Sequence, residues 1–239
     1  RSPAETAPSR GLHLLHQALP DRFCQGRQED AEEFLSFLLR SVSASYGGDG
    51  SGAVACVTGR ALEPSACLWG SMRRTRECAS CHRTLTSDPE PFCLLPLPIP
   101  GDSERVCVQD LLTDELAREE ILTGTHGYRC SSCGRLSSAR QHSMVVSPPE
   151  LLALQLKRFK FSTSNQVQKI MTPVEIDQSL AIFCVDGPVF YVPYAVVMHA
   201  GLDVDRGHFF SICRCSGCAA FCRDPTTPGV AGLGQHWRT

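Results

Sequence analysis

The amino-acid sequence predicts an α+β fold, with helices in the first part of the chain, strands in the last part and a cysteine-rich arm between them. Three observations lead to this prediction. Apolar residues recur at helical spacing over about residues 28–42, two Cys-x-x-Cys pairs lie in the middle of the chain, and strand-like apolar runs dominate residues 152–213. The 239 residues suit one large domain or two small ones, and 42% hydrophobic with 20% charged residues is typical of a globular protein.

Two helices are predicted in the first 45 residues. Residues 12–19 have leucines on one helical face and end at Pro20, which stops the turn. Asp30 and three nearby glutamates suit the positive end of a helix dipole, at the start of a longer helix over about residues 28–42. The glycine-rich stretch at 46–52 is typical of an insertion or a subdomain boundary. The apolar residues of the longer helix follow the i, i+3, i+4, i+7 pattern: Ala31, Phe34, Leu35, Leu38 and Val42.

The later elements follow in order. Residues 92–99 alternate apolar residues with prolines, as expected for an extended edge segment, and residues 108–122 return to helical spacing. Residues 152–161, 189–198 and 208–213 are β-rich, with a polar turn at 201–207. In the first of these runs, the leucines up to Leu156 share one side and Phe159 and Phe161 take the other. A bulge or sharp twist is therefore expected between them.

Composition and charge narrow the classes of function. The 23 Lys and Arg against 25 Asp and Glu give a net charge of -2, so no overall field drives the chain onto nucleic acid or anionic lipid. No apolar run approaches the roughly 18 residues of a membrane span. Residues 1–10 lack the apolar segment of a signal peptide, and the chain starts as if cut from a longer one. Its 14 cysteines are therefore expected to be reduced, in an intracellular protein that is cytoplasmic, nuclear or both.

The cysteine spacing indicates a metal site. About 0.8 cysteine pairs at a separation of three would be expected by chance, and the chain has three. Cys78 with Cys81 and Cys130 with Cys133 have matching neighbourhoods, and two such turns facing each other supply the four sulfurs that Zn²⁺ prefers. Gly134 supplies the positive-φ turn that such hairpins favour. We expect one structural zinc ion here; the alternative is two coincidental surface pairs.

A second group of thiols and a long connection complete the cysteine pattern. The 48 residues between the first two pairs would have to leave the metal site, fold elsewhere and return to it. Near the end of the chain, four thiols lie within ten residues: Cys213, Cys215, Cys218 and Cys222. This group is compatible with a second zinc site and equally with reduced thiols that bind no metal.

Two histidines at strand ends are candidates for a general base. His199 ends one predicted strand and His208 begins the next, on either side of the polar turn. A histidine at a strand end beside glycines can reach a substrate without steric obstruction. Gly207 removes a Cβ from the approach to His208, which favours His208 over His199. Taken alone, either residue could equally be an ordinary surface or core histidine.

A set of short motifs occurs in a fixed order over about residues 20–214. It begins with the run from Gln28 to Leu35, and the later members are Trp69-Gly70, Pro91-Phe92, Leu97-Pro98-Ile99-Pro100, Tyr128, Pro149, Leu151-Leu152, Leu156-Lys157-Arg158-Phe159, Lys169, Tyr194, His199-Ala200-Gly201 and Gly207-His208-Phe209. In this order and rough spacing, the set resembles the ubiquitin-specific proteases, which are papain-like cysteine deubiquitinases.

The resemblance implies a papain-like architecture of thumb, palm and fingers, with a zinc ribbon at the tip of the fingers. It divides the chain into thumb helices (10–45), a flexible insertion (46–66), fingers with the zinc ribbon (67–144), a palm (145–214) and a divergent tail or insertion (215–239). The implied partners are ubiquitin and ubiquitinated proteins, without nucleic acid or membrane. The zinc ligands would be the cysteines at 78, 81, 130 and 133.

The resemblance also implies an activity, the hydrolysis of isopeptide or peptide bonds at the C-terminal glycine of ubiquitin. His208 would be the general base that deprotonates a catalytic thiol. Gln28 and Asp30 would bind substrate, with Asp30 at the position that holds the basic tail of ubiquitin. Asp30 also suits the helix dipole, and the two roles are compatible.

Three features depart from the family pattern. The nucleophile box, an asparagine several residues before a cysteine that opens a helix, has no counterpart in the chain. Cys24 is a poor substitute, because in the family this position follows the nucleophile by a long stretch; we expect the nucleophile upstream of Arg1, and the chain alone to be inactive. Phe209 replaces the usual tyrosine. The residue that orients the base is expected after Thr239, with Asp224 as the alternative.

Two other functions remain open. A pseudoenzyme of this fold would bind ubiquitin without cutting it. In a longer protein, the residues before Arg1 and after Thr239 would distinguish it from an active enzyme, which needs a nucleophilic cysteine and a residue that orients the base. A zinc ribbon that binds nucleic acid is suggested by four arginines: Arg73, Arg74, Arg76 and Arg83. Such arginines more often form a solvated face, and no interleaved aromatic residues support stacking on bases.

Overall fold

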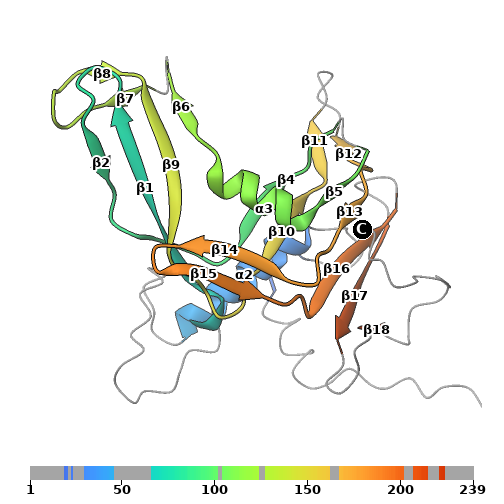
Figure 1. The fold of residues 1–239 in the computed structure, drawn as a ribbon. Coiled ribbons are helices and arrows are strands. Elements are labelled where there is room, and N and C mark those ends of the chain that lie inside the picture. Colours follow the sequence, from blue (N-terminus) through green and yellow to red (C-terminus); the bar gives the residue numbers. More distant parts are fainter. Residues whose placement is uncertain are drawn as a thin grey trace, which may run out of the picture.

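The computed structural model, drawn in Figure 1, describes residues 19–20, 23, 30–45, 66–101, 104–123, 127–161, 167–201, 207–214 and 221–223. Within these ranges the chain forms two α-helices, one short 3-10 helix, η2 (Ala66–Leu68), and strands in six sheets. This mixture of helices and strands is the predicted α+β fold. Neither α-helix in the described part of the chain is long and apolar enough to cross a membrane.

The largest sheet has seven strands and contains a long arm (Figure 1). Its central pair, β1 (Gly70–Cys78) and β9 (Ala139–Ser147), runs antiparallel over nearly the full length of both strands. The order is β15-β14-β9-β1-β2, while β3 pairs with β1 and β6 with β9. The flanking strands are β2 (Thr84–Thr86), β3 (Glu90–Phe92), β6 (Glu120–Leu122), β14 (Leu180–Cys184) and β15 (Gly187–Tyr191). We call β1, β2, β6 and β9, with β7 (Tyr128–Arg129) and β8 (Leu136–Ser137) at their tip, the arm.

Gly70 lies where three segments meet at the base of the arm. A Cβ at this position would come within 2.8 Å of the Phe92 ring, the Pro149 ring and the carbonyl oxygen of Ser147. Only glycine therefore allows β1 to approach β3 and the end of β9 this closely.

The hydrophobic core lies beside the base of the arm. There α3 (Val108–Ala117) packs against β4 (Leu95–Pro98), β9 and β14. The helix begins after Cys107, whose sulfur accepts a hydrogen bond from the N–H of Asp110. The fully buried side chains of the core come from segments that are distant in sequence: Leu97, Leu112, Val145, Val174 and Ile182.

Four smaller sheets surround this core. β4 pairs in parallel with β10 (Leu154–Lys157), and β5 (Val106–Cys107) with β13 (Val174–Glu175). β11 (Phe159–Phe161) pairs with β12 (Val167–Lys169). β16 (Ala195–Ala200), β17 (His208–Arg214) and β18 (Phe221–Arg223) form a three-stranded antiparallel sheet. The proline-containing β4 has one partner strand, which confirms the predicted edge segment.

Most predicted elements are present with shifted boundaries. The helix predicted over 28–42 is α2 (Ala31–Ser45). The bulge or sharp twist predicted near residue 158 is instead a break between two strands, because β10 ends at Lys157 and β11 belongs to another sheet. The segments 12–18 and 46–52 lie outside the described residues.

One prediction of element type was wrong, and one predicted β-rich run is divided into two strands. The helix predicted over 108–122 ends at Ala117, because Arg118 is extended and residues 120–122 pair with β9 instead. Ile121, which extended the helical pattern, is 63% exposed. The β-rich run at 189–198 is two strands in different sheets, separated at Pro193, which lacks the N–H that a continuous ladder needs.

Replacing Leu112 with alanine is expected to lower the free energy of unfolding by about 2–5 kcal/mol, because a fully buried side chain leaves a cavity. Leu136→Ala is the matched control: this leucine is 64% exposed, so the loss should stay below about 0.5 kcal/mol. Urea denaturation followed by circular dichroism measures both. Equal losses in the two variants would show that the core is not centred on α3.

Candidate functional site

Four cysteine sulfurs come together at the tip of the arm. Cys78 ends β1 and Cys81 lies in the turn that follows, while Cys130 and Cys133 lie between β7 and β8. The four Sγ atoms all lie within 4.8 Å of one another, and those of Cys81 and Cys130 are 3.7 Å apart. The structure therefore brings together all four residues that the sequence selected as metal ligands.

The two Cys-x-x-Cys turns have the same backbone hydrogen bonds. The N–H of His82 donates to the carbonyl of Cys78 over 2.8 Å, and the N–H of Gly134 donates to that of Cys130 over 2.8 Å. In both turns the N–H of the first cysteine donates to the carbonyl five residues later. The residue after the second cysteine has a positive φ in each case, 56° at His82 and 69° at Gly134. The sequence indicated this conformation only for the glycine.

The electrostatics of the cluster favour a bound cation. A backbone hydrogen bond from Ser80 stabilises the thiolate of Cys78 and lowers its pKa to about 6. At Cys81 a backbone hydrogen bond from Arg83 lowers the pKa, but burial and the other three sulfurs outweigh it and raise the pKa to about 11. Thiolates at this spacing repel one another unless a positive charge lies between them. The cluster could therefore hold a metal ion, and four thiolates would leave no open position for chemistry.

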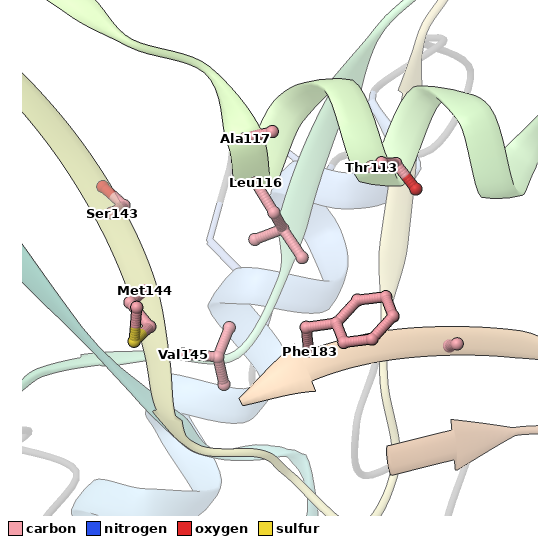
Figure 2. Close-up of a pocket in the computed structure, with 8 residues that line it drawn as sticks. Thr113, Leu116, Ala117, Ser143, Met144, Val145 and Phe183 are labelled. Carbon is pink, nitrogen blue, oxygen red and sulfur yellow. The ribbon is translucent and has the colours of Figure 1, made fainter. Parts of the chain in front are cut away.

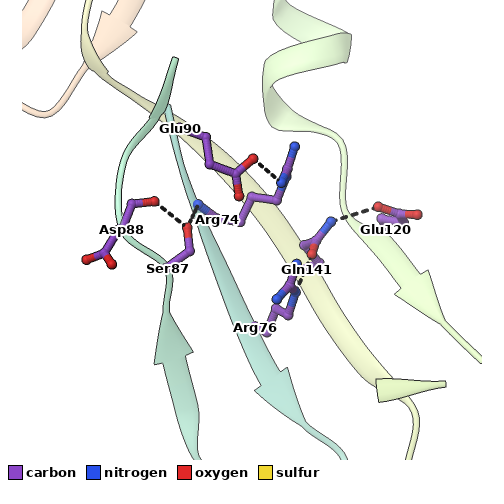
Figure 3. A network of polar contacts seen from close by, with 7 residues as sticks. All are labelled: Arg74, Arg76, Ser87, Asp88, Glu90, Glu120 and Gln141. Carbon is purple, nitrogen blue, oxygen red and sulfur yellow. Dashed lines mark hydrogen bonds and ion pairs between the residues drawn. The ribbon is translucent and has the colours of Figure 1, made fainter. Parts of the chain in front are cut away.

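Polar contacts on the arm engage two of the arginines that suggested nucleic-acid binding. Figure 3 shows Arg74 of β1 in an ion pair with Glu90 of β3. Arg76 donates from Nε to Oε1 of Gln141 on β9. Gln141 in turn donates to Glu120 of β6 over 2.8 Å. Arg76 therefore ties β1 to β9 within the arm, and Arg74 ties β1 to β3 beside it.

The two candidate histidines lie on opposite faces of one sheet. His208 is the first residue of β17, and its side chain is exposed. In the pairing of β16 with β17, His208 lies opposite Ala200, and His199 lies opposite Phe209. Adjacent residues of a strand point to opposite faces, so the two imidazoles face away from each other. The His199 ring is half-buried against Phe209, with centroids 4.7 Å apart, whereas His208 is exposed.

Gly207 and Lys169 contribute to this region in ways that the sequence did not indicate. A Cβ at position 207 would lie 2.1 Å from Nε2 of His199, so the glycine permits a close approach of the chain to that ring. The Nζ atom of Lys169 lies 3.2 Å from Nδ1 of the same ring. Lys169 belongs to the recognised motifs, but spacing alone gave no sign of a contact with a residue 30 positions away.

Asp30 lies directly before α2 and caps it. Its Oδ1 accepts hydrogen bonds from the N–H of Glu32 over 2.7 Å and of Glu33 over 3.4 Å. These bonds satisfy N–H groups that have no partner within the first turn of the helix. Cys213, from the second cysteine group, is exposed on β17. Five other candidates lie outside the described residues: Cys24, Gln28, Cys215, Cys218 and Asp224.

A shallow apolar pocket of about 220 Å³ opens where α3 faces the arm (Figure 2). Phe183 and Met144, at 71% and 47% exposed, supply apolar surface to its lining. Such a lining fits an apolar side chain better than a charged group. The residues come from three elements: Thr113, Leu116 and Ala117 of α3, Ser143, Met144 and Val145 of β9, and Ala181 and Phe183 of β14.

Known proteins match the sequence over most of its length. The sequence model of the ubiquitin carboxyl-terminal hydrolase family matches residues 2–223. Two human relatives, ubiquitin carboxyl-terminal hydrolase 17-like protein 15 and 17-like protein 5, are each 30% identical to the chain over 206 residues. These matches cover 82% of the chain but only 34% and 36% of the two relatives. The chain therefore spans about a third of the length of these relatives.

Solved structures match the fold. The SAGA DUB module of Ubp8, Sgf11, Sus1 and Sgf73 bound to ubiquitin aldehyde matches with a TM-score of 0.67 at 22% identity, over 87% of this chain and 47% of that chain. A SAGA DUB module bound to monoubiquitin matches with a TM-score of 0.63 at 24% identity, over 80% and 42%. These matches confirm the predicted fold class.

Proposed function

The chain belongs to the ubiquitin carboxyl-terminal hydrolase family, and on that basis we propose that it forms most of the catalytic domain of a cysteine-type deubiquitinase. The observation that carries the proposal is the exposed His208 at the start of β17, within the part of the chain that the family model matches. In this proposal α2 belongs to the thumb, the arm to the fingers, and the sheet of β16 and β17 to the palm. The substrate is a bond that follows the C-terminal glycine of ubiquitin.

His208 is the proposed general base toward a cysteine thiol. The imidazole takes the thiol proton, the thiolate attacks the carbonyl carbon of the glycine, and the bond to the amine of the modified protein breaks. The imidazolium gives the proton to the departing amine. A water molecule, deprotonated by the same imidazole, then hydrolyses the thioester, which releases the ubiquitin carboxylate and regenerates the thiol.

The nucleophile is proposed to precede Arg1 in the full-length protein. Cys213 lies on the same strand as His208, but it is five residues further along and therefore faces the other side of the sheet. The residue that orients the imidazole is proposed to follow Thr239, with Asp224 as the alternative.

Asp30 and Gln28 are the proposed contacts for the basic tail of ubiquitin. Both capping hydrogen bonds of Asp30 end on Oδ1. A carboxylate has two oxygens that accept hydrogen bonds, so Oδ2 can bind a basic side chain while Oδ1 caps α2. The capping role and the binding role are therefore compatible in one residue.

Substituting Asp30 separates these two roles. Asp30→Asn keeps an oxygen that can cap α2 but removes the charge, so ubiquitin affinity should fall while stability is retained. Asp30→Ala removes both, and should also lower the free energy of unfolding by about 1 kcal/mol. Isothermal titration calorimetry with ubiquitin and urea denaturation measure the two effects. Unchanged affinity in both variants would contradict the binding role.

Zinc is the proposed metal of the four-cysteine cluster. Four sulfurs placed about 2.3 Å from a central zinc ion at tetrahedral angles are about 3.8 Å apart. The Sγ atoms of Cys81 and Cys130, 3.7 Å apart, already have this separation. Zinc would hold the two turns at the tip of the arm together, and its role would be structural.

Metal analysis of the purified chain should find about one zinc ion per molecule. Cys78→Ser should abolish binding and unfold the arm, because the binding free energy of such a site is also folding free energy. Cys67→Ser, at a half-buried thiol outside the cluster, is the control and should retain the metal. An intact arm in a preparation that contains no metal would contradict the proposal.

His208→Ala in the full-length protein should reduce hydrolysis of a ubiquitin fusion by at least about 100-fold, because no base then activates the thiol. Ubiquitin affinity should change little. His142→Ala, at an exposed histidine on the arm, is the control and should retain turnover. Full turnover in His208→Ala would refute the assigned base, and ubiquitin binding without turnover in the unsubstituted protein would favour the pseudoenzyme.

A further inference from the structure

The side chain of Lys169 joins β12 to the end of β16 and to the residue that follows it. Its Nζ atom donates to the carbonyl of His199 over 3.0 Å and to the carbonyl of Gly201 over 2.5 Å. It also lies 3.2 Å from Nδ1 of His199. An ammonium group has three N–H donors, so one short segment can engage all three.

The two carbonyl groups flank the residue that pairs with His208. Ala200 lies opposite His208 in the register of β16 and β17, and its neighbours in the chain are His199 and Gly201. Lys169 therefore holds the backbone on both sides of the pairing partner of His208. Because these contacts reach from a different sheet, they restrict movement of the β16 end relative to β12.

The imidazole of His199 links Lys169 to the residue directly before β17. Because Lys169 donates to Nδ1, the neutral ring carries its proton on Nε2. Burial and the charge of Lys169 lower the pKa of His199, which favours this neutral form. The ring contacts Phe159 and Phe209, with centroids 6.2 Å and 4.7 Å away. Its Nε2 edge faces Gly207, directly before His208.

The Nε2 edge of the His199 ring is packed against Gly207. Its Nε2 atom is buried and has no hydrogen-bond partner among the residues that the structure describes. The ring fills the space against Gly207, and its orientation is set by Lys169.

We propose that Lys169, acting through His199 and the backbone around Ala200, is a positioning residue that orients the imidazole of His208. The proposal rests on the proposed function, because it takes His208 as the general base. It assigns to Lys169 an effect on the rate of the chemical steps, without contact with the substrate.

The first test is kinetic and uses Lys169→Met in the full-length protein. Because a base that is misplaced by about 1 Å can cost about 100-fold in rate, kcat should fall by about 10- to 100-fold while KM and ubiquitin affinity stay unchanged. Lys169→Arg, which can still donate to both carbonyls, should recover part of the loss. Lys160→Met, at an exposed lysine on the neighbouring β11, is the matched control and should behave as the unsubstituted protein.

Two kinetic results would overturn the proposal. One is an unchanged kcat in Lys169→Met. The other is a loss of ubiquitin affinity parallel to the loss of kcat, because that pattern indicates general unfolding.

A double-substitution cycle tests the contact between His199 and Gly207. Gly207→Ala should lower kcat, because the added Cβ collides with the ring. His199→Ala removes the collision with the ring but leaves the one with the carbonyl oxygen of Ala200, which the Cβ would approach to 2.6 Å. Adding Gly207→Ala to His199→Ala should therefore lower kcat by a smaller factor than Gly207→Ala does in the unsubstituted protein. If the losses of kcat in the two single variants simply multiply in the double variant, the proposed role of His199 is wrong.

Nuclear magnetic resonance on the chain itself distinguishes this proposal from the proposed function. The ¹⁵N shifts of His199 should report a proton on Nε2, and the ring resonances of His208 should shift in Lys169→Met and not in Lys160→Met. Unchanged His208 resonances in Lys169→Met would overturn the positioning role. If His208→Ala retained turnover, the proposed function would fail while these resonances could still show that Lys169 orients His208.

Discussion

The cluster of four sulfurs is the constraint on which the arrangement of the arm depends. It joins the end of β1 to a turn that lies about 50 residues later, with the sulfurs within 4.8 Å of one another. The segment between the two turns leaves the arm, contributes β4 and α3 to the core, and returns along β6. A metal ion bound between the cysteines would therefore hold this segment at the tip, and apolar packing holds it at the base.

Helix α3 connects this constraint to the strands that lead to His208. Besides its buried face, it uses Gln109, whose side chain accepts from the N–H of Ala181 over 2.7 Å and donates to the carbonyl of the same residue over 3.1 Å. These two bonds satisfy the backbone N–H and carbonyl of Ala181 in the way that a paired strand would, and they attach α3 to β14. β14 continues through β15 to β16, so regular elements link the helix to the sheet that carries the histidine.

Features that depend on local spacing could be predicted from the sequence, and features that depend on long-range contacts could not. The Cys-x-x-Cys turns, the acidic start of α2 and the strand that begins at His208 each have a local signal, and the structure contains all three. Residues 120–122 continue a helical pattern, but pairing with β9 outweighs this preference. The positive φ of His82 belongs to the local turn, but a histidine, unlike Gly134, gives no sign of that conformation. The contacts of Lys169 had no signal, because they involve a residue 30 positions away that the fold brings in.

The antiparallel pairing of Cys78 with Ala139 has a consequence for how the arm assembles. Strands so far apart in sequence meet only after a large loss of chain entropy, so β1 and β9 should join later than α3 forms. If β1 and β9 paired one residue out of register, every side chain of one strand would face the wrong side of the sheet. A cation captured by the two local turns would align the strand ends before the ladder closes, so the supply of metal would govern the accuracy of assembly as well as the durability of the finished arm.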